Sequence, residues 1–304
     1  MGSSQSRSEP RTASAGQQGR LEVPWRNIDW GQKAALINRL EEFTVCHPDV
    51  QCIKILLVGQ VGAGKSSFIN SVNSALQGRI TSASLADSSG ACWSHSFTQR
   101  FRTHRVRTAN RYLNFSFCDI MGLESEAGPQ PEEIINAIFG HVKEGYKFNR
   151  ENPVTLDSEY FERNPDICDQ VFCVVYIISA ELIHFMHERL IENLRIIRRT
   201  ISDRGIPQVI VMTKVDETCP LVRGDLRKIY ISRRIKDKME MCSDMLGVPM
   251  SFIFPVKNYH EEIDTDDNID VLILKAVDQI VHVANDRLMD EVRLDWSGPS
   301  LVVR

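Results

Sequence analysis

The fold of this chain is decided by one stretch, Gly59-Gln60-Val61-Gly62-Ala63-Gly64-Lys65-Ser66, which fits the phosphate-loop pattern G-x-x-x-x-G-K-[ST] throughout. The apolar run 53–58 before it predicts a buried strand, and residues 67–72 after it predict the start of a helix. The glycines let successive main-chain N–H groups converge on an anion, and the helix N-terminus adds partial positive charge. This strand–loop–helix setting predicts a nucleotide phosphate site.

The residues of this loop have separate expected roles. Lys65 reaches the β- and γ-phosphates of a nucleotide, and the Ser66 hydroxyl is a ligand for Mg²⁺. Further nucleotide contacts are expected from Gly59, Gly62, Ala63, Gly64 and Ser67. The motif alone does not separate kinases, ATPases and GTPases, and an ordinary glycine-rich turn is the alternative interpretation.

A second motif, Cys118-Asp119-Ile120-Met121-Gly122, follows a predicted antiparallel hairpin over residues 101–107 and 112–118. An aspartate at the end of a strand can hold the Mg²⁺ shell, directly or through water. The main-chain N–H of Gly122 can approach the γ-phosphate. D-x-x-G is a weak motif alone, and a plain Asp/Gly turn is the alternative, but its place after the strand favours the nucleotide site.

A third motif, Thr213-Lys214-Val215-Asp216, directly follows the predicted strand 209–212 and is similar to the guanine-reading [NT]-K-x-D element. A carboxylate at Asp216 accepts the guanine N1–H and N2–H₂, two donors that adenine does not offer on that edge. The methylenes of Lys214 cover the base. Thr213 replaces the commoner asparagine, so we expect one tethering amide to be lost. A solvated turn is the alternative.

Three further positions complete the expected site. A threonine before the second strand should meet Mg²⁺ and the γ-phosphate, and Thr98 is preferred over the competing serines at 94 and 96. After the last strand, Val256-Lys257-Asn258 could supply main-chain contacts to the guanine O6. Leu123 stands where many GTPases place a water-orienting glutamine, which predicts slow hydrolysis unless Glu124 or a partner supplies that group.

The composition sets limits on the class of protein. The chain has 304 residues, 42% hydrophobic and 25% charged, as in an ordinary soluble globular protein. Its net charge of −4 argues against broad nucleic-acid binding, and we expect no specific nucleic-acid partner. No run is apolar and long enough to span a membrane. The eight cysteines are scattered without a C-x-x-C pair, which favours reduced thiols in a cytoplasmic protein and no zinc site.

The first residues carry a signal of their own. The opening Met-Gly-Ser-Ser-Gln-Ser fits the N-myristoylation pattern M-G-x-x-x-[ST], so an acylated Gly2 could give weak, reversible membrane contact. A flexible tail that happens to begin with these residues is the alternative. We expect residues 1–23 to form a disordered arm, because the segment is polar and rich in Ser, Gly and Arg.

The rest of the chain is expected to form one unit. Residues 24–50 predict a lead-in helix packed on the main domain, residues 51–292 the phosphate-loop GTPase-like domain, and residues 293–304 a flexible tail. Strands and helices alternate through the second half, as in right-handed βαβ crossovers. The expected class is α/β: a Ras-like, doubly wound P-loop NTPase with a mostly parallel sheet and one antiparallel strand.

Taken together, these motifs resemble the GTP-binding half of the interferon-induced protein 44 and 44-like family. The resemblance covers about residues 24–290 and includes Tyr146-Lys147-Phe148-Asn149, Phe254-Pro255-Val256-Lys257-Asn258-Tyr259 and Asp270-Val271-Leu272-Ile273-Leu274. It implies an interferon-induced P-loop GTPase with an antiviral or growth-restraining role. Longer members carry a further N-terminal domain, so this chain is expected to be a short form without it.

The leading hypothesis is a Mg²⁺-dependent protein that binds GTP or GDP in innate antiviral immunity, with unidentified protein partners and slow or partner-dependent hydrolysis. The second hypothesis is a scaffold that binds nucleotide without useful hydrolysis, and Leu123 at the water-orienting position favours it. An ATP-dependent phosphotransferase is the third.

Overall fold

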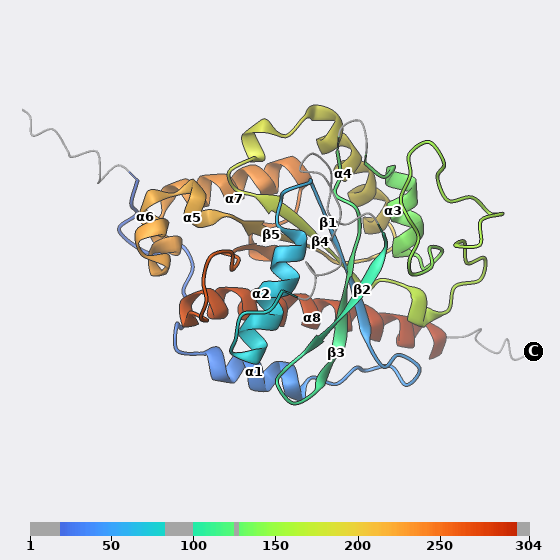
Figure 1. The fold of residues 1–304 in the computed structure, drawn as a ribbon, viewed down its shortest axis with the longest axis horizontal. Coiled ribbons are helices and arrows are strands. Elements are labelled where there is room, and N and C mark those ends of the chain that lie inside the picture. The colour runs from blue at the N-terminus through green and yellow to red at the C-terminus, as the bar shows by residue number, and fades with distance from the viewer. Residues whose placement is uncertain (1–18, 83–99, 125–127, 297–304) are drawn as a thin grey trace, which may run out of the picture.

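The computed structural model describes residues 19–82, 100–124 and 128–296. A six-stranded sheet with the order β2-β3-β1-β4-β5-β6 forms its centre (Figure 1). The strands are β1 (Ile53–Gly59), β2 (Arg102–Arg107), β3 (Tyr112–Asp119), β4 (Cys173–Ser179), β5 (Gln208–Thr213) and β6 (Ile253–Pro255). Neighbouring strands are parallel except for the antiparallel pair of β2 and β3. The predicted doubly wound α/β class and hairpin are confirmed.

The two central strands, β1 and β4, are nearly all apolar. Every residue of β4 is buried, and within β1 only Lys54 reaches partial exposure. Continuous apolar strands of this kind are typical of a parallel sheet that helices cover on both faces. The core therefore lies along the middle of the sheet.

Helices form a layer on each face of the sheet (Figure 1). α2 (Lys65–Gln77) packs beside α8 (Asp267–Trp296), and α1 (Lys33–Glu42) lies against the outside of α8. The other layer holds α3 (Pro131–Ile138), α4 (Glu188–Ser202) and α7 (Arg233–Leu246). The shorter helices are α5 (Val215–Thr218), α6 (Pro220–Gly224), η2 (Ile167–Asp169), η3 (Ile183–Phe185), η4 (Leu226–Ile231) and η5 (Met250–Phe252).

Two helices begin later than the sequence predicts: the apolar stripe over residues 180–203 predicts a helix from about residue 180, and the charged segment 223–246 predicts one from about residue 223. The helix expected from about residue 180 begins at Glu188, because His187 is extended and its ring accepts a hydrogen bond from the Arg189 N–H as an N-cap. The helix expected from about residue 223 is divided. Ser232 is extended and caps α7 by accepting from the Ile235 N–H. Local capping groups thus decide where both helices begin.

The strand register brings several chain segments to one edge of the sheet. Gly59 lies opposite Ile177 of β4, and the end of β3 pairs with β1 through Asp119 and Leu57. Parallel strands place their carboxyl ends at a common edge, and ligands of doubly wound sheets bind there. In the described ranges, no helix combines the length and apolar character needed to cross a membrane.

Candidate nucleotide-binding site

The phosphate loop joins β1 to α2 at this edge of the sheet. Gly59 must be glycine, because a Cβ there would lie 2.3 Å from the carbonyl oxygen of Ile177 on β4. Gly64 is the N-cap of α2 and has a φ of 93°, a left-handed conformation that strains other residues. The α2 N-terminus therefore begins at the loop, as an anion site requires.

Lys65 is buried beneath the loop. Its ammonium donates hydrogen bonds to the carbonyl oxygens of Gly59 at 3.2 Å and Gln60 at 3.5 Å. Burial lowers the pKa of Lys65, and the nearby charge of Asp119 opposes part of that shift. A polyphosphate would offer this ammonium the anionic partner that two carbonyl groups do not provide.

Ser66 and Asp119, the two predicted Mg²⁺ ligands that the structure describes, lie in contact. The Ser66 hydroxyl donates to Asp119 Oδ2 at 3.0 Å, and Asp119 is buried at the end of β3. Hydroxyl and carboxylate oxygens suit Mg²⁺, which usually takes its remaining ligands from phosphates and water. The residues present therefore fit the ion. Within the described part of the chain, no group of three or more His, Cys, Asp or Glu side chains could hold a metal by itself.

The segment after Asp119 folds back onto the phosphate loop. The Leu123 N–H donates to the Gly59 carbonyl at 3.0 Å, and the Val61 N–H donates to the Leu123 carbonyl at 3.3 Å. The Leu123 side chain is fully buried, so it belongs to the core. Glu124 follows and is half-buried, and its role as a substitute for glutamine stays a prediction.

Thr213 ends β5 and joins the third motif to the phosphate loop. Its hydroxyl donates to the Ala63 carbonyl at 2.6 Å, and both groups are buried. We expected the exchange of asparagine for threonine to lose a tether, but the hydroxyl makes one. Sequence reasoning expected a main-chain contact at Asn258, but its side-chain amide donates to the Gly64 carbonyl at 3.2 Å. Two side chains that lie far from the loop in the sequence therefore hold it.

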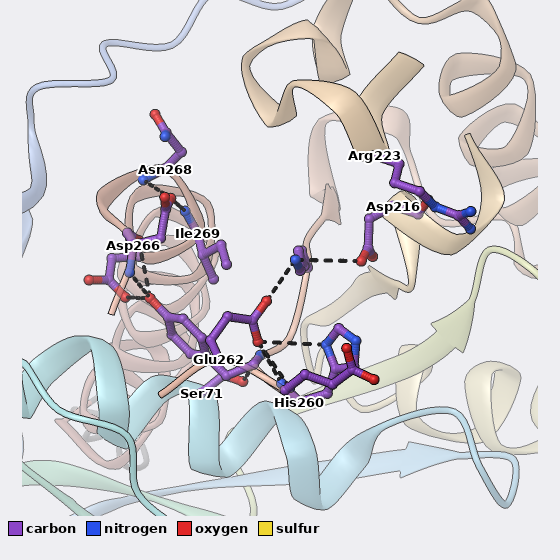
Figure 2. A network of polar contacts seen from close by, with 12 residues as sticks. Ser71, Asp216, Arg223, His260, Glu262, Asp266, Asn268 and Ile269 are labelled. Carbon is purple, nitrogen blue, oxygen red and sulfur yellow. Dashed lines mark hydrogen bonds and ion pairs between the residues drawn. The ribbon is translucent and has the colours of Figure 1, made fainter. Parts of the chain in front are cut away.

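Asp216, the expected base reader, lies in the short helix α5 that follows β5. Lys214 precedes it with a φ of 57°, and its ammonium lies 3.6 Å from Glu217. The main-chain carbonyl of Asp216 accepts from Arg223 Nε at 3.2 Å, which fixes this short helix (Figure 2). The Asp216 side chain is only 14% exposed, and its Oδ2 lies 3.7 Å from Lys257 Nζ. Lys257 therefore approaches Asp216 through its side chain, whereas we expected a main-chain contact to the base from this segment.

The structure brings the predicted residues of three motifs and Lys257 to one edge of the sheet. Ser67 lies on α2 beside them, and Gly122 lies against Val61 of the loop. Thr98, its competing serines and Gly2 lie outside the described residues. The strand order and the phosphate loop define a doubly wound phosphate-loop protein of the α/β class.

Comparison with known proteins identifies relatives. Interferon-induced protein 44 of Homo sapiens is 32% identical over 261 residues, which cover 85% of this chain and 58% of that protein. The Mus musculus protein of the same name is 30% identical over 257 residues, covering 84% of this chain and 60% of that protein. Human interferon-induced protein 44-like is 31% identical over 242 residues, covering 78% and 53%. The chain is thus related to the interferon-induced protein 44 and 44-like family, as the motifs predicted.

The chain spans less than two thirds of the length of these relatives, from 53% to 60%. No family model matches it. Among solved structures, the crystal structure of a probable GTP-binding protein engB aligns with a TM-score of 0.42 and 13% identity, covering 77% of this chain and 99% of that chain.

Proposed function

We propose that this chain binds a guanine nucleotide together with Mg²⁺ at the carboxyl edge of its sheet. The hydrogen bond from Thr213 to the Ala63 carbonyl supports the proposal most directly, because it joins the base-reading segment to the phosphate loop. A phosphate site and a carboxylate for the base thereby belong to one site.

Each end of the nucleotide has a distinct set of protein groups. The amides of the loop and Lys65 hold the phosphates, and Asp216 accepts the N–H donors of guanine. Ser66 and Asp119 would hold Mg²⁺, which neutralises phosphate charge when bound. Thr98 stays a proposed third ligand.

Hydrolysis is proposed to be slow or to depend on a partner. Leu123 is buried and its main chain is hydrogen-bonded to the phosphate loop, so it has neither the chemistry nor the position to orient water. A nucleotide-dependent scaffold is the second candidate function, and the same burial of Leu123 favours it. Single-turnover measurements with and without cell extract separate a partner-activated GTPase from such a scaffold.

The biological setting is proposed from the relatives. The names of the relatives indicate induction by interferon, which supports a role in innate antiviral immunity with protein partners of unknown identity. A cytoplasmic location and weak membrane contact through an acylated Gly2 stay predictions. Mass spectrometry of the N-terminal peptide from eukaryotic cells tests the acylation.

Titration calorimetry with Mg²⁺ and either GTP, GDP or ATP tests the nucleotide class. The wild type should bind GTP or GDP, and Asp216→Ala should weaken GTP binding about 100-fold while leaving ATP binding unchanged, because two hydrogen bonds to a carboxylate are lost. Asp244→Ala, an exposed carboxylate on α7, is the matched control. Preference of the wild type for ATP would instead support a phosphotransferase.

A further inference from the structure

The loop after β6 places a lysine between two carboxylates beside the base end of the site. Lys257 Nζ lies 2.7 Å from Glu262 Oε1 and 3.7 Å from Asp216 Oδ2, and Figure 2 labels both acids. All three side chains are largely buried, with exposed fractions of 21%, 24% and 14% for Lys257, Glu262 and Asp216. The lysine therefore has a short contact to one carboxylate and a long one to the other.

The difference between these distances matters for base recognition. A separation of 3.7 Å is too long for a hydrogen bond, so the ammonium stabilises the charge of Asp216 without occupying its oxygen atoms. Those oxygens keep their capacity to accept N–H donors from a base. Without Glu262, the attraction between opposite charges would draw Lys257 onto Asp216 and block it.

Both members of the close pair stay charged over a wide pH range. Burial by itself lowers the pKa of Lys257, but the hydrogen bond to Glu262 and the surrounding carboxylates raise that pKa above its usual value. Burial likewise opposes ionisation of Glu262, yet Lys257 and main-chain N–H groups lower the pKa of Glu262 to about 2. The His260 ring is 3.6 Å from the other oxygen of Glu262.

Glu262 is itself held in place by the fold. Its Oε2 accepts hydrogen bonds from the N–H groups of His260 at 2.9 Å and Glu261 at 3.2 Å, which leaves Oε1 for Lys257. The same loop is fixed to both neighbouring helices. The Tyr259 N–H donates to Ser71 Oγ on α2 at 2.9 Å, and the Tyr259 hydroxyl donates to Asp270 on α8 at 2.6 Å. Since α2 also begins at the phosphate loop, the lysine has a fixed place relative to bound phosphates.

We propose that the Lys257 ammonium donates to the guanine O6 and that Glu262 is the positioning residue that keeps it beside Asp216. Guanine presents O6 next to N1–H and N2–H₂ on one edge, so an ammonium beside a carboxylate matches that edge. Adenine presents an amino donor where guanine has O6, and an ammonium repels it. The inference rests on the proposed guanine site and adds a second determinant of base choice to Asp216.

The test compares Glu262→Gln, Lys257→Met and the double variant by calorimetry with GTP, ATP and 6-thio-GTP, in which sulfur replaces O6. Glu262→Gln should weaken GTP binding about tenfold and leave ATP binding unchanged, as expected for one displaced charge-assisted hydrogen bond. In the Lys257→Met background the same change should alter GTP affinity by less than about twofold, because the lysine it positions is gone. Glu261→Gln is the matched control on the neighbouring exposed residue.

The analogue separates the O6 contact from general loop damage. The wild type should bind GTP more tightly than 6-thio-GTP, because sulfur accepts a hydrogen bond poorly, and Lys257→Met should remove most of that preference. This comparison stands even if Glu262→Gln fails to fold. A Glu262→Gln variant with unchanged GTP affinity, an equal loss of GTP and ATP, or an equal loss in the Lys257→Met background would overturn the inference. If the wild type binds GTP tightly but the variants give one of these contrary results, only the inference about Lys257 and Glu262 fails. If the wild type does not bind GTP, the proposed function fails with it.

Discussion

The proposed nucleotide site has a phosphate end and a base end, and the two are built in different ways. At the phosphate end, main-chain groups of one continuous loop do most of the work, and their shape depends on close approaches such as that of Gly59 to Ile177. At the base end, charged side chains from separate segments meet, with Asp216 after β5 and Lys257 and Glu262 after β6.

This difference teaches how each end should respond to mutation. A main-chain site is fixed by sterics, so a single added methyl group damages it, and mutation cannot remove its amide donors, whereas a substitution can remove the ammonium of Lys65 at that end. A side-chain site is assembled by long-range contacts, so its charges can be removed one at a time with graded effects. The following predictions run from the largest expected effect to the smallest.

Lys65→Ala should show the greatest loss, because Lys65 is the charged side chain of the phosphate end that main-chain amides cannot replace. We expect GTP affinity to fall about 1000-fold in calorimetry, equivalent to about 4 kcal/mol. The melting temperature should stay the same or rise, since a buried ammonium is removed. Lys236→Ala on α7 is the exposed control, and affinity within tenfold of wild type for Lys65→Ala would refute the assigned role.

Gly59→Ala should break the phosphate end through the fold itself. Its new Cβ would lie 2.3 Å from a β4 carbonyl, so β1 and β4 must separate. We expect the free energy of unfolding in urea to fall by about 3 kcal/mol. Gly224→Ala, where a Cβ would meet nothing within 4 Å, should change it by less than about 0.5 kcal/mol. Equal effects of the two variants would contradict the steric argument.

Lys33→Met tests whether helix α1 stabilises the loop after β6 that carries Lys257 and Glu262. Lys33 on α1 lies 2.7 Å from Asp270, a fully buried carboxylate that also accepts from Tyr259 of the base-end loop. Removing the lysine leaves that buried charge with fewer partners, so the free energy of unfolding should fall by about 2 kcal/mol.

A surface pair provides the comparison for Lys33. Lys236→Met breaks an exposed pair with Glu240 on α7 and should change the free energy of unfolding by less than about 0.5 kcal/mol. If urea titrations give the two variants the same stability, the base-end loop does not depend on α1.

Glu262→Gln should have the smallest effect on stability and a defined pH dependence. The folded pKa of Glu262 is about 2, against a usual value of 4.5, so its ion pair stabilises the fold above pH 4.5. As pH falls from 4.5 towards 2, the unfolded chain takes up the proton first and this stabilisation is lost. Urea titrations should show the variant less stable by about 1 kcal/mol at pH 7 and equal to wild type near pH 2. A difference that persists at pH 2 would count against the ion pair.

Prediction from sequence worked best where spacing along the chain carries the information. The strand–loop–helix setting of the phosphate loop, the hairpin and the alternation of strands and helices follow from local patterns, and the structure confirms them. The helix starts expected near residues 180 and 223 were wrong, because the side chains of His187 and Ser232 cap α4 and α7 further along the chain. The relationship to interferon-induced protein 44 was also predicted from the motifs.

The side-chain contacts around the base end could not be predicted from the sequence. Thr213 was expected to lose a tether, yet its hydroxyl reaches Ala63, which lies far from it in the sequence. Asn258 was expected to give only a main-chain contact, and its side-chain contact to Gly64 becomes visible only once β1 and β6 have their places in the sheet. Glu262 lies in the same loop as Lys257, but no motif spacing marks it as the partner of that lysine.

The sequence by itself determined the phosphate loop, the α/β class and the candidate metal ligands Ser66 and Asp119, because each depends on residue type and local conformation. Only the tertiary structure decided that Leu123 is a core residue, that Thr213 holds the loop, and that Lys257 stands between two carboxylates. The physical reason is the distance along the chain between the residues that interact. A turn is set by the residues within it, whereas an ion pair is set by the strands that bring its members within a few ångströms.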